Sequence, residues 1–229
     1  MQIYGIFGTK VKASMGEIGL ATIIIIAINV IVSYKGFKDR AFFEKYKFNV
    51  GDIKRGAKYQ IISSGFLHVD STHLFVNMLT LYFFANVVIF DLNAIGFIAV
   101  YLASLILGNL LSYFFHKDED SYTAVGASGA VMGILYSAIL LRPDMMLGLF
   151  FIIPIPAYVF GIGYLLYTIY GMKKRLGNIG HDAHFGGAVG GYILTLLLAP
   201  WIVQQHLLMV ILLAIPIVIL FILQKTGRI

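Results

Sequence analysis

Seven long stretches of apolar residues constrain the fold of this chain more than any other feature of its sequence. They cover approximately residues 18–34, 72–90, 94–115, 124–141, 145–170, 183–200 and 202–223. A helix needs about 20 apolar residues to cross a bilayer, and it must pair its backbone polar groups within its own segment there. The sequence therefore predicts an all-α polytopic membrane protein, a helical bundle with seven transmembrane helices.

Composition supports this prediction. Of the 229 residues, 59% are hydrophobic and 12% are charged, which is more apolar surface than one soluble core can bury. Without an internal repeat or low-complexity tract, we expect a single domain over 1–229, with a core at about 18–200 and an extra span at about 202–223. The first apolar run comes after Lys10 and Lys12. Because no small-residue cleavage site follows the run, we interpret it as a retained transmembrane span and not as a removed signal peptide.

The basic residues indicate a membrane surface as partner. The net charge is +6, and Lys and Arg stand in short stretches between the apolar runs. The connection 35–66 mixes them with aromatic residues, which favours the lipid headgroup layer over a solvated basic loop and over nucleic acid. We expect an integral, multi-pass protein of a bacterial-type inner or plasma membrane, with an organelle membrane as the alternative. The absence of cysteine excludes disulfides and thiol catalysis.

Polar residues gather where three of the predicted spans begin. The second span opens with His68, His73 and Asn77, the fourth with residues 126–129, and the sixth with residues 181–184. Ionisable and amide side chains are costly at membrane depth, so they indicate a functional site. If every apolar stretch crosses the membrane, even-numbered spans start on the same side. The three clusters are then expected to converge at a similar depth.

The residue types in these clusters are those of nucleophilic catalysis. A serine hydroxyl becomes an effective nucleophile when a base lies within about 2.6–3.2 Å, and Ser128 and His184 are the candidate pair. Gly-x-x-x-Gly faces begin at Gly129 and Gly187, and such faces let helices approach closely. Taken alone, these glycines indicate only helix packing, the serine a bond to its own helix, and the histidine an interfacial group. Their joint occurrence favours a site.

Three motifs of this sequence resemble those of the rhomboid intramembrane proteases, in residue types and in their order along the chain, over roughly residues 59–191. The family typically has Gly-x-Ser-Gly in its fourth span, Ala-His-x-x-Gly-x-x-x-Gly in its sixth and His-x-x-x-Asn in its second. The matching residues here are Gly126, Ala127, Ser128 and Gly129, then Ala183, His184, Gly187 and Gly191, and finally His73 and Asn77. The seventh predicted span is similar to the C-terminal helix that some members add to a six-helix core.

The resemblance implies an intramembrane serine endopeptidase without a cofactor or metal. Ser128 would be the nucleophile and His184 its base, in a dyad that lacks a carboxylate. Asp182 lies two residues from His184 and so faces another way on a helix. The residues expected to bind the oxyanion or the substrate are His68, His73, Asn77, Gly126, Ala127 and Gly129. The implied substrates are single-span membrane proteins, cleaved in or near their transmembrane segment; the oligomeric state is left open.

The chain departs from the family pattern at several positions. Tyr59 and Gln60 stand where Trp-Arg is common, and Ile89 stands where an acidic residue is common. Met132 takes a place where an aromatic ring often packs on the base. The usual family orientation also conflicts with the positive-inside rule, because it leaves only three of the 17 Lys and Arg residues in the cytoplasm. We expect the family orientation, with the basic connection embedded at the membrane interface.

Three other functions remain as alternatives. A pseudoprotease would bind membrane clients on the same fold, but both dyad residues are present. A small transporter would place polar residues along several helices at the midplane, whereas here they crowd one side. A zinc peptidase is the third alternative, but this sequence lacks the His-Glu-x-x-His pattern that such enzymes usually carry. Its ligands would be His68, His73, His181 and His184.

Overall fold

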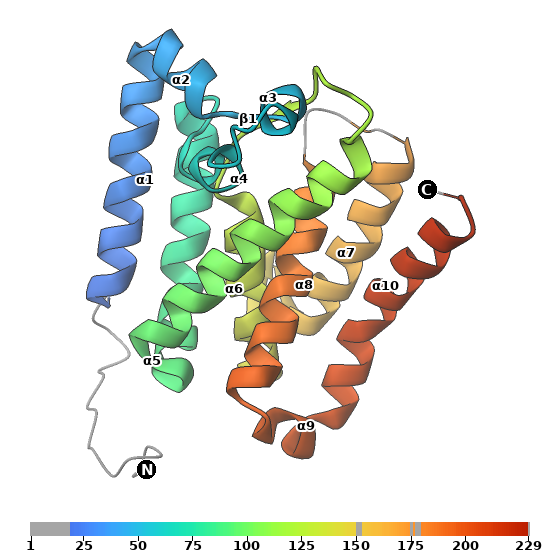
Figure 1. Ribbon diagram of the computed structural model, residues 1–229. Helices are drawn as coiled ribbons and strands as arrows, with labels where there is room; N and C mark the ends of the chain where they lie inside the picture. Colours follow the sequence, from blue (N-terminus) through green and yellow to red (C-terminus); the bar gives the residue numbers. More distant parts are fainter. Residues whose placement is uncertain (1–18, 150–152, 175, 177–179, 229) are drawn as a thin grey trace.

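A computed structural model describes residues 19–149, 153–174, 176 and 180–228 of the chain. These residues form a bundle of helices with two short antiparallel ribbons (Figure 1). The ribbons are β1 (Phe48–Asn49) with β2 (Thr123–Ala124), and β3 (Met146–Leu149) with β4 (Ile153–Pro156). The all-α polytopic fold class predicted from the sequence is confirmed.

The helices follow one another along the chain, most of them joined by short connections. They are α1 (Leu20–Lys38), α2 (Arg40–Tyr46), α3 (Val50–Lys54), α4 (Gln60–Ser63), the 3-10 helix η1 (Ser64–Phe66), α5 (Ser71–His116), α6 (Ser128–Leu141), α7 (Ala157–Lys174), α8 (His181–Leu198), α9 (Trp201–Gln205) and α10 (Leu207–Lys225). By length and composition, α1, α5 and α10 can each cross a membrane.

Helix α5 contains two of the predicted spans. Its 46 residues would extend about 69 Å at 1.5 Å per residue, more than twice the hydrocarbon core. Asn93 interrupts the helical backbone with φ 59° and ψ −179°. Its Oδ1 accepts hydrogen bonds from the backbone N–H groups of Ile95 at 2.9 Å and Gly96 at 3.2 Å, which caps the second half. The break agrees with the separate spans expected at 72–90 and 94–115.

Helix α6 is the central helix, because all of its residues except Ser128 and Met132 are buried. It begins at Ser128, so the span expected from residue 124 starts too early. The preceding residues Thr123–Ala124 instead pair with β1. At the other end, Arg142 forms an ion pair with Asp91 of α5 at 2.9 Å. Asp91 therefore supplies an acidic partner near the end of the second span, although position 89 is Ile.

The span expected at 145–170 is wrong in its first part. Its start forms the β3–β4 hairpin, and α7 begins only at Ala157. Pro154 and Pro156 explain the difference, since proline lacks an N–H and disfavours a helical conformation in the residue before it. The last span also begins later than residue 202, because His206 interrupts the helix between α9 and α10.

The predicted glycine faces of α6 and α8 pack against each other. A side-chain carbon at Gly187 would collide with the carbonyl oxygen of Gly129, and one at Gly191 with that of Gly133. Helix α5 approaches as closely, since a Cβ at Gly108 would lie 2.6 Å from the Ala183 carbonyl oxygen. The helices that carry the predicted serine and histidine are therefore in backbone contact.

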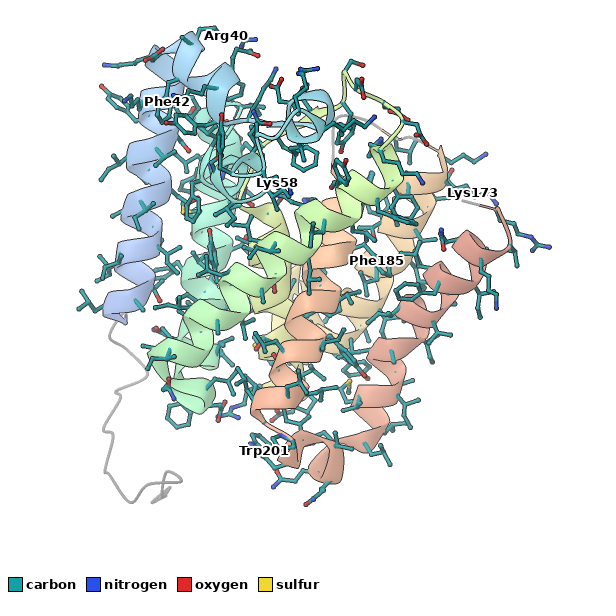
Figure 2. The ribbon with its side chains drawn as sticks, viewed as in Figure 1. Arg40, Phe42, Lys58, Lys173, Phe185 and Trp201 are labelled. Atoms are coloured by element: carbon teal, nitrogen blue, oxygen red, sulfur yellow. The ribbon has the colours of Figure 1, made fainter. Side chains whose placement is uncertain are left out.

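The basic connection between α1 and α5 lies at one end of the bundle. Arg40, Phe42 and Lys58 mark this end in Figure 2, and Trp201 marks the opposite end. Lys35 Nζ lies 4.5 Å from the centre of the Phe42 ring, and the Arg40 guanidinium lies 5.5 Å from another aromatic ring. Aromatic and basic groups are thus combined as a membrane surface requires, and the headgroup location stays a prediction. Lys10 and Lys12 lie outside the described residues.

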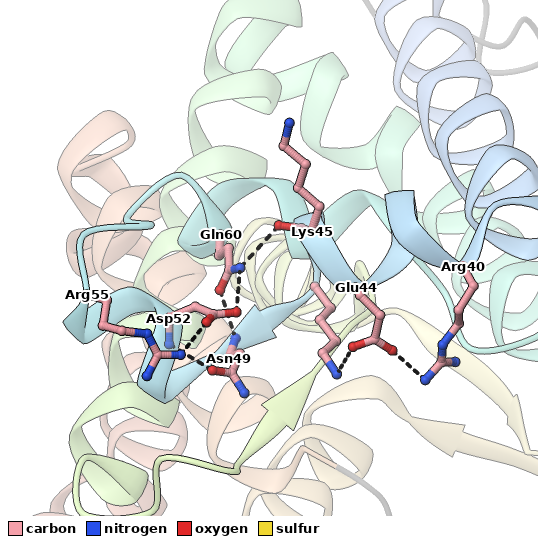
Figure 3. Close-up of polar contacts among 8 residues, drawn as sticks. Arg40, Glu44, Lys45, Asn49, Asp52, Arg55 and Gln60 are labelled. Atoms are coloured by element: carbon pink, nitrogen blue, oxygen red, sulfur yellow. Dashed lines mark hydrogen bonds and ion pairs between the residues drawn. The ribbon is translucent and has the colours of Figure 1, made fainter.

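Gln60 holds the basic connection together where the family often has arginine. The side chain is buried, and Figure 3 shows its contacts. Its Nε2 donates to the Lys45 carbonyl at 3.1 Å and to Asp52 Oδ2 at 3.4 Å, while its Oε1 accepts from Asn49 N–H at 3.1 Å. Arg55 donates a 2.6 Å hydrogen bond to Asp52 and so lowers the pKa of that carboxyl. The neutral amide of Gln60 thus links three parts of the basic connection.

Candidate active site

A glycine turn places Ser128 at the start of α6. Gly126 has φ +134°, which side-chain-bearing residues rarely adopt, and its N–H donates to the Ser64 carbonyl at 3.0 Å. A Cβ at this position would lie 2.7 Å from His73 Cε1 and 3.7 Å from Ser128 Oγ. Glycine is therefore required both for the backbone angle and for the approach of the His73 ring to the serine.

His73 and Asn77 lie on one face of the first two turns of α5. Asp70 caps this helix by accepting a 2.7 Å hydrogen bond from His73 N–H. The Asn77 side chain is 6% exposed, and its Nδ2 has no hydrogen-bond partner among the described residues. An unpaired buried amide costs about 1–3 kcal/mol, so this donor is available for an acceptor that the described residues do not supply.

His184 lies in the first turn of α8. Its backbone N–H donates to the Gly180 carbonyl at 3.0 Å. Its ring nitrogen Nδ1 is 2.7 Å from the hydroxyl oxygen of Tyr164 on α7. The next residue, Phe185, is fully buried and lies near the centre of the bundle in Figure 2.

One cavity of about 960 Å³ unites the three polar clusters. Five of the residues expected from the sequence line it: Ser128, His184, His73, Asn77 and Gly126. Met132 and Tyr164 also line it, and Arg40 and Lys47 of the basic connection form part of its wall. Both of these basic residues pair with Glu44, as Figure 3 shows for Arg40. The cavity thus brings together a serine, a histidine, an amide side chain and two basic side chains.

His68 occupies a different place from the one expected. It is fully buried and is not among the residues that line the cavity. Ser33 of α1 uses its only proton on the Phe66 carbonyl at 3.0 Å, so its oxygen accepts from His68 Nδ1–H at 2.8 Å. His68 Nε2 accepts from Ala127 N–H at 3.4 Å. The histidine therefore holds the loop before Ser128 in place, and it does so without lining the cavity.

Replacing His68 by alanine is expected to destabilise the fold. The change leaves the buried Ala127 N–H without its acceptor, which costs about 1–3 kcal/mol, and it also removes the donor to Ser33 Oγ, which keeps its hydrogen bond to the Phe66 carbonyl. Thermal unfolding of the purified protein in detergent should show a lower midpoint. His206→Ala, at the opposite end of the bundle, should unfold at the wild-type temperature. Equal midpoints for the two variants would contradict this supporting role.

The other residues singled out from the sequence pack around the site. Ala127 is buried, and a Cβ at Gly129 would lie 3.1 Å from the Ala183 carbonyl oxygen. Asp182 is buried with its Oδ2 3.5 Å from His116 Nε2, so it faces the end of α5. His181 is buried beside the Tyr167 ring, at 5.4 Å between ring centres. Within the described residues, no three His, Asp or Glu side chains gather as a metal site requires.

Tyr164 is a cavity residue that the sequence motifs do not indicate. It belongs to no motif and lies inside an apolar stretch, 20 residues before His184. The available signal was Met132, which leaves the expected aromatic position beside the base unfilled. An aromatic residue from another helix was then the replacement to look for.

The fold and site define a polytopic helical membrane protein with a serine and a histidine in one cavity. The rhomboid domain family model matches residues 55–201, which is more than half of the chain. The chain therefore belongs to the rhomboid family, and the resemblance drawn from the motifs is confirmed. The prediction of one domain over 1–229 stays a prediction.

Curated relatives carry rhomboid names. RHOMBOID-like protein 12, mitochondrial, of Arabidopsis thaliana is 28% identical over 72% of this chain and 54% of its own length. Rhomboid protein 1, mitochondrial, of Saccharomyces cerevisiae is 32% identical over 66% of this chain and 45% of its own. The human presenilin-associated rhomboid-like protein, mitochondrial, is 31% identical over 57% and 35%. The chain spans about half or less of the length of these relatives.

Proposed function

We propose that the chain is an intramembrane serine endopeptidase that cleaves single-span membrane proteins in or near their transmembrane segment. The observation that carries this proposal is the shared cavity of Ser128 and His184, with the unpartnered amide of Asn77 on its wall. A nucleophile, a base and a free donor are the three elements that acyl transfer requires. Family membership supports the same reaction.

The mechanism follows from the roles available to these side chains. Ser128 Oγ attacks the scissile carbonyl while His184 accepts its proton. His184 then gives this proton to the leaving amine, and a water molecule hydrolyses the acyl-enzyme by the reverse proton path. We propose that the peptide and the water reach the serine through the cavity, which Arg40 and Lys47 also line.

The oxyanion of the tetrahedral intermediate has donors on two helices. The N–H of Ser128 belongs to the first turn of α6, where backbone N–H groups lack helical partners and the helix dipole favours negative charge. The Asn77 amide and the His73 ring approach from α5. Donors that are already in place stabilise the developing charge without reorganisation.

Replacing Asn77 by alanine is expected to slow cleavage by about 10- to 1,000-fold, because one oxyanion donor among several is lost. The measurement is kcat on a transmembrane substrate in detergent or proteoliposomes. Gln204→Ala is the control, since it removes an exposed amide at the far end of the bundle. A wild-type rate for the Asn77 variant would remove this residue from the oxyanion site.

The direct test of the proposed function is covalent labelling of the wild-type protein with a fluorophosphonate probe. An activated serine should react, and mass spectrometry of the labelled peptide should place the adduct on Ser128. Folded protein that does not react, or that reacts at another serine, would overturn the proposal and favour a client-binding pseudoprotease.

The membrane that holds the chain is proposed from its relatives. The protein is an integral membrane protein, and the mitochondrial names of the relatives support an organelle membrane over the bacterial-type membrane expected from the sequence. The family orientation, with the catalytic opening away from the N-terminal side, stays a prediction. Labelling of an engineered cysteine at Ser121 with an impermeant reagent reports on it.

A further inference from the structure

The hydroxyl of Tyr164 is the one side-chain group that is hydrogen-bonded to the His184 ring in the described part of the chain. The distance from the tyrosine oxygen to His184 Nδ1 is 2.7 Å. The ring centres are 6.0 Å apart at an interplanar angle of 32°, so the two side chains meet through these polar atoms and not by stacking. The tyrosine ring instead stacks on Phe160, one turn earlier on α7, at 5.8 Å and 16°.

The direction of this hydrogen bond determines whether His184 can act as a base. A neutral imidazole carries its proton on one nitrogen only. If Tyr164 donated its proton to Nδ1, the histidine proton would be on Nε2, and neither nitrogen could receive the serine proton. If Nδ1–H donates to the tyrosine oxygen, Nε2 is left with a free lone pair. Only the second arrangement is competent for catalysis.

We propose that Tyr164 is a positioning residue that accepts the Nδ1–H hydrogen bond of His184 and so holds the ring in the tautomer that can deprotonate Ser128. This inference rests on the proposed proteolytic function. Tyrosine then takes the place that a carboxylate has in a triad, without bringing a charge into the membrane.

The packing of α7 shows why Tyr164 is held in this position. The Tyr136 hydroxyl of α6 donates a hydrogen bond to the Gly161 carbonyl, three residues before Tyr164. Gly161 also packs closely on α6, because a Cβ there would lie 3.0 Å from Ile139 Cδ1. These two contacts hold α7 against α6, the helix that begins with Ser128. Tyr164 is thereby kept at the level of His184.

The available carboxylate does not compete for this role. Asp182, the acidic residue nearest to His184 in the sequence, points to His116 at the end of α5. His73 and His181 are the charged or titratable neighbours that act on His184 electrostatically, and a histidine pair provides no anion. The tyrosine oxygen is therefore the acceptor that the described residues offer to Nδ1.

The test compares Tyr164→Phe with Tyr170→Phe. Both variants lose one hydroxyl from α7, but Tyr170 is exposed and lies outside the cavity. We expect Tyr164→Phe to lower kcat and the rate of fluorophosphonate labelling by about 10- to 100-fold, less than loss of the base, with KM unchanged. Tyr170→Phe should match the wild type. Equal rates for both variants would overturn the inference.

A second readout does not depend on activity. In protein labelled with ¹⁵N in the histidine rings, a His184→Gln spectrum identifies the His184 signals by their loss. The wild type should show Nδ1 protonated and Nε2 free, and Tyr164→Phe should shift His184 toward the Nε2–H tautomer. An unchanged tautomer in Tyr164→Phe would overturn the inference. A wild type with the expected tautomer but without serine labelling would overturn the proposed function alone.

Discussion

Replacing Ser128 or His184 by alanine is expected to abolish cleavage of a transmembrane substrate. Each change removes one half of a unit, because the hydroxyl is a weak nucleophile without its base and the base has no proton to take without the hydroxyl. We expect a fall of about 10⁴-fold or more in kcat for either variant, to the background of the assay. Cleavage of a reporter with one transmembrane span, followed by electrophoresis, measures it.

The double variant sharpens this prediction. Residues that act as one unit are not additive, so Ser128→Ala combined with His184→Ala should be no slower than either single variant. Neither change should lower the thermal unfolding midpoint appreciably, because Ser128 and His184 both face the cavity. His206→Ala serves as the control for a histidine far from the site. Substantial activity in a folded single variant would contradict the dyad.

The spans and the convergence of the polar clusters could be expected from the sequence because both depend on local signals. Apolar length defines a crossing helix, and the parity of crossings places His73, Ser128 and His184 at one end. The observed cavity contains all three residues. The β3–β4 hairpin was missed because an apolar count does not distinguish a strand from a helix, although Pro154 and Pro156 carried the signal.

The neighbours of the site could not be derived in the same way. Whether His68 faces the cavity or the loop behind it depends on the rotation of the chain and on the position of Ser33, which is 35 residues away. The contact between Tyr164 and His184 depends on how α7 packs against α6 and α8. Such contacts follow from tertiary packing, and sequence spacing between separate helices does not report it.

Replacing Gly187 by alanine is expected to break the contact between α6 and α8. The new methyl group would collide with the backbone of Gly129, and a backbone in the centre of the bundle cannot move aside as a flexible side chain can. In an exposed helix the same change would gain about 0.5–1 kcal/mol from helix propensity. Here we expect a loss of about 3 kcal/mol or more, because overpacking at a backbone contact outweighs that gain.

Gly163→Ala is the matched control for this prediction. Gly163 also lies in a helix of the bundle, but apart from the backbone of its own helix no heavy atom of the described residues lies within 4 Å of the position that its Cβ would take. Its variant should unfold at the wild-type temperature or slightly above, whereas Gly187→Ala should unfold well below it in the same detergent. Because Gly129 directly follows the nucleophile, the Gly187 variant should also lose serine labelling. Equal unfolding temperatures for the two variants would show that these helices are not in backbone contact.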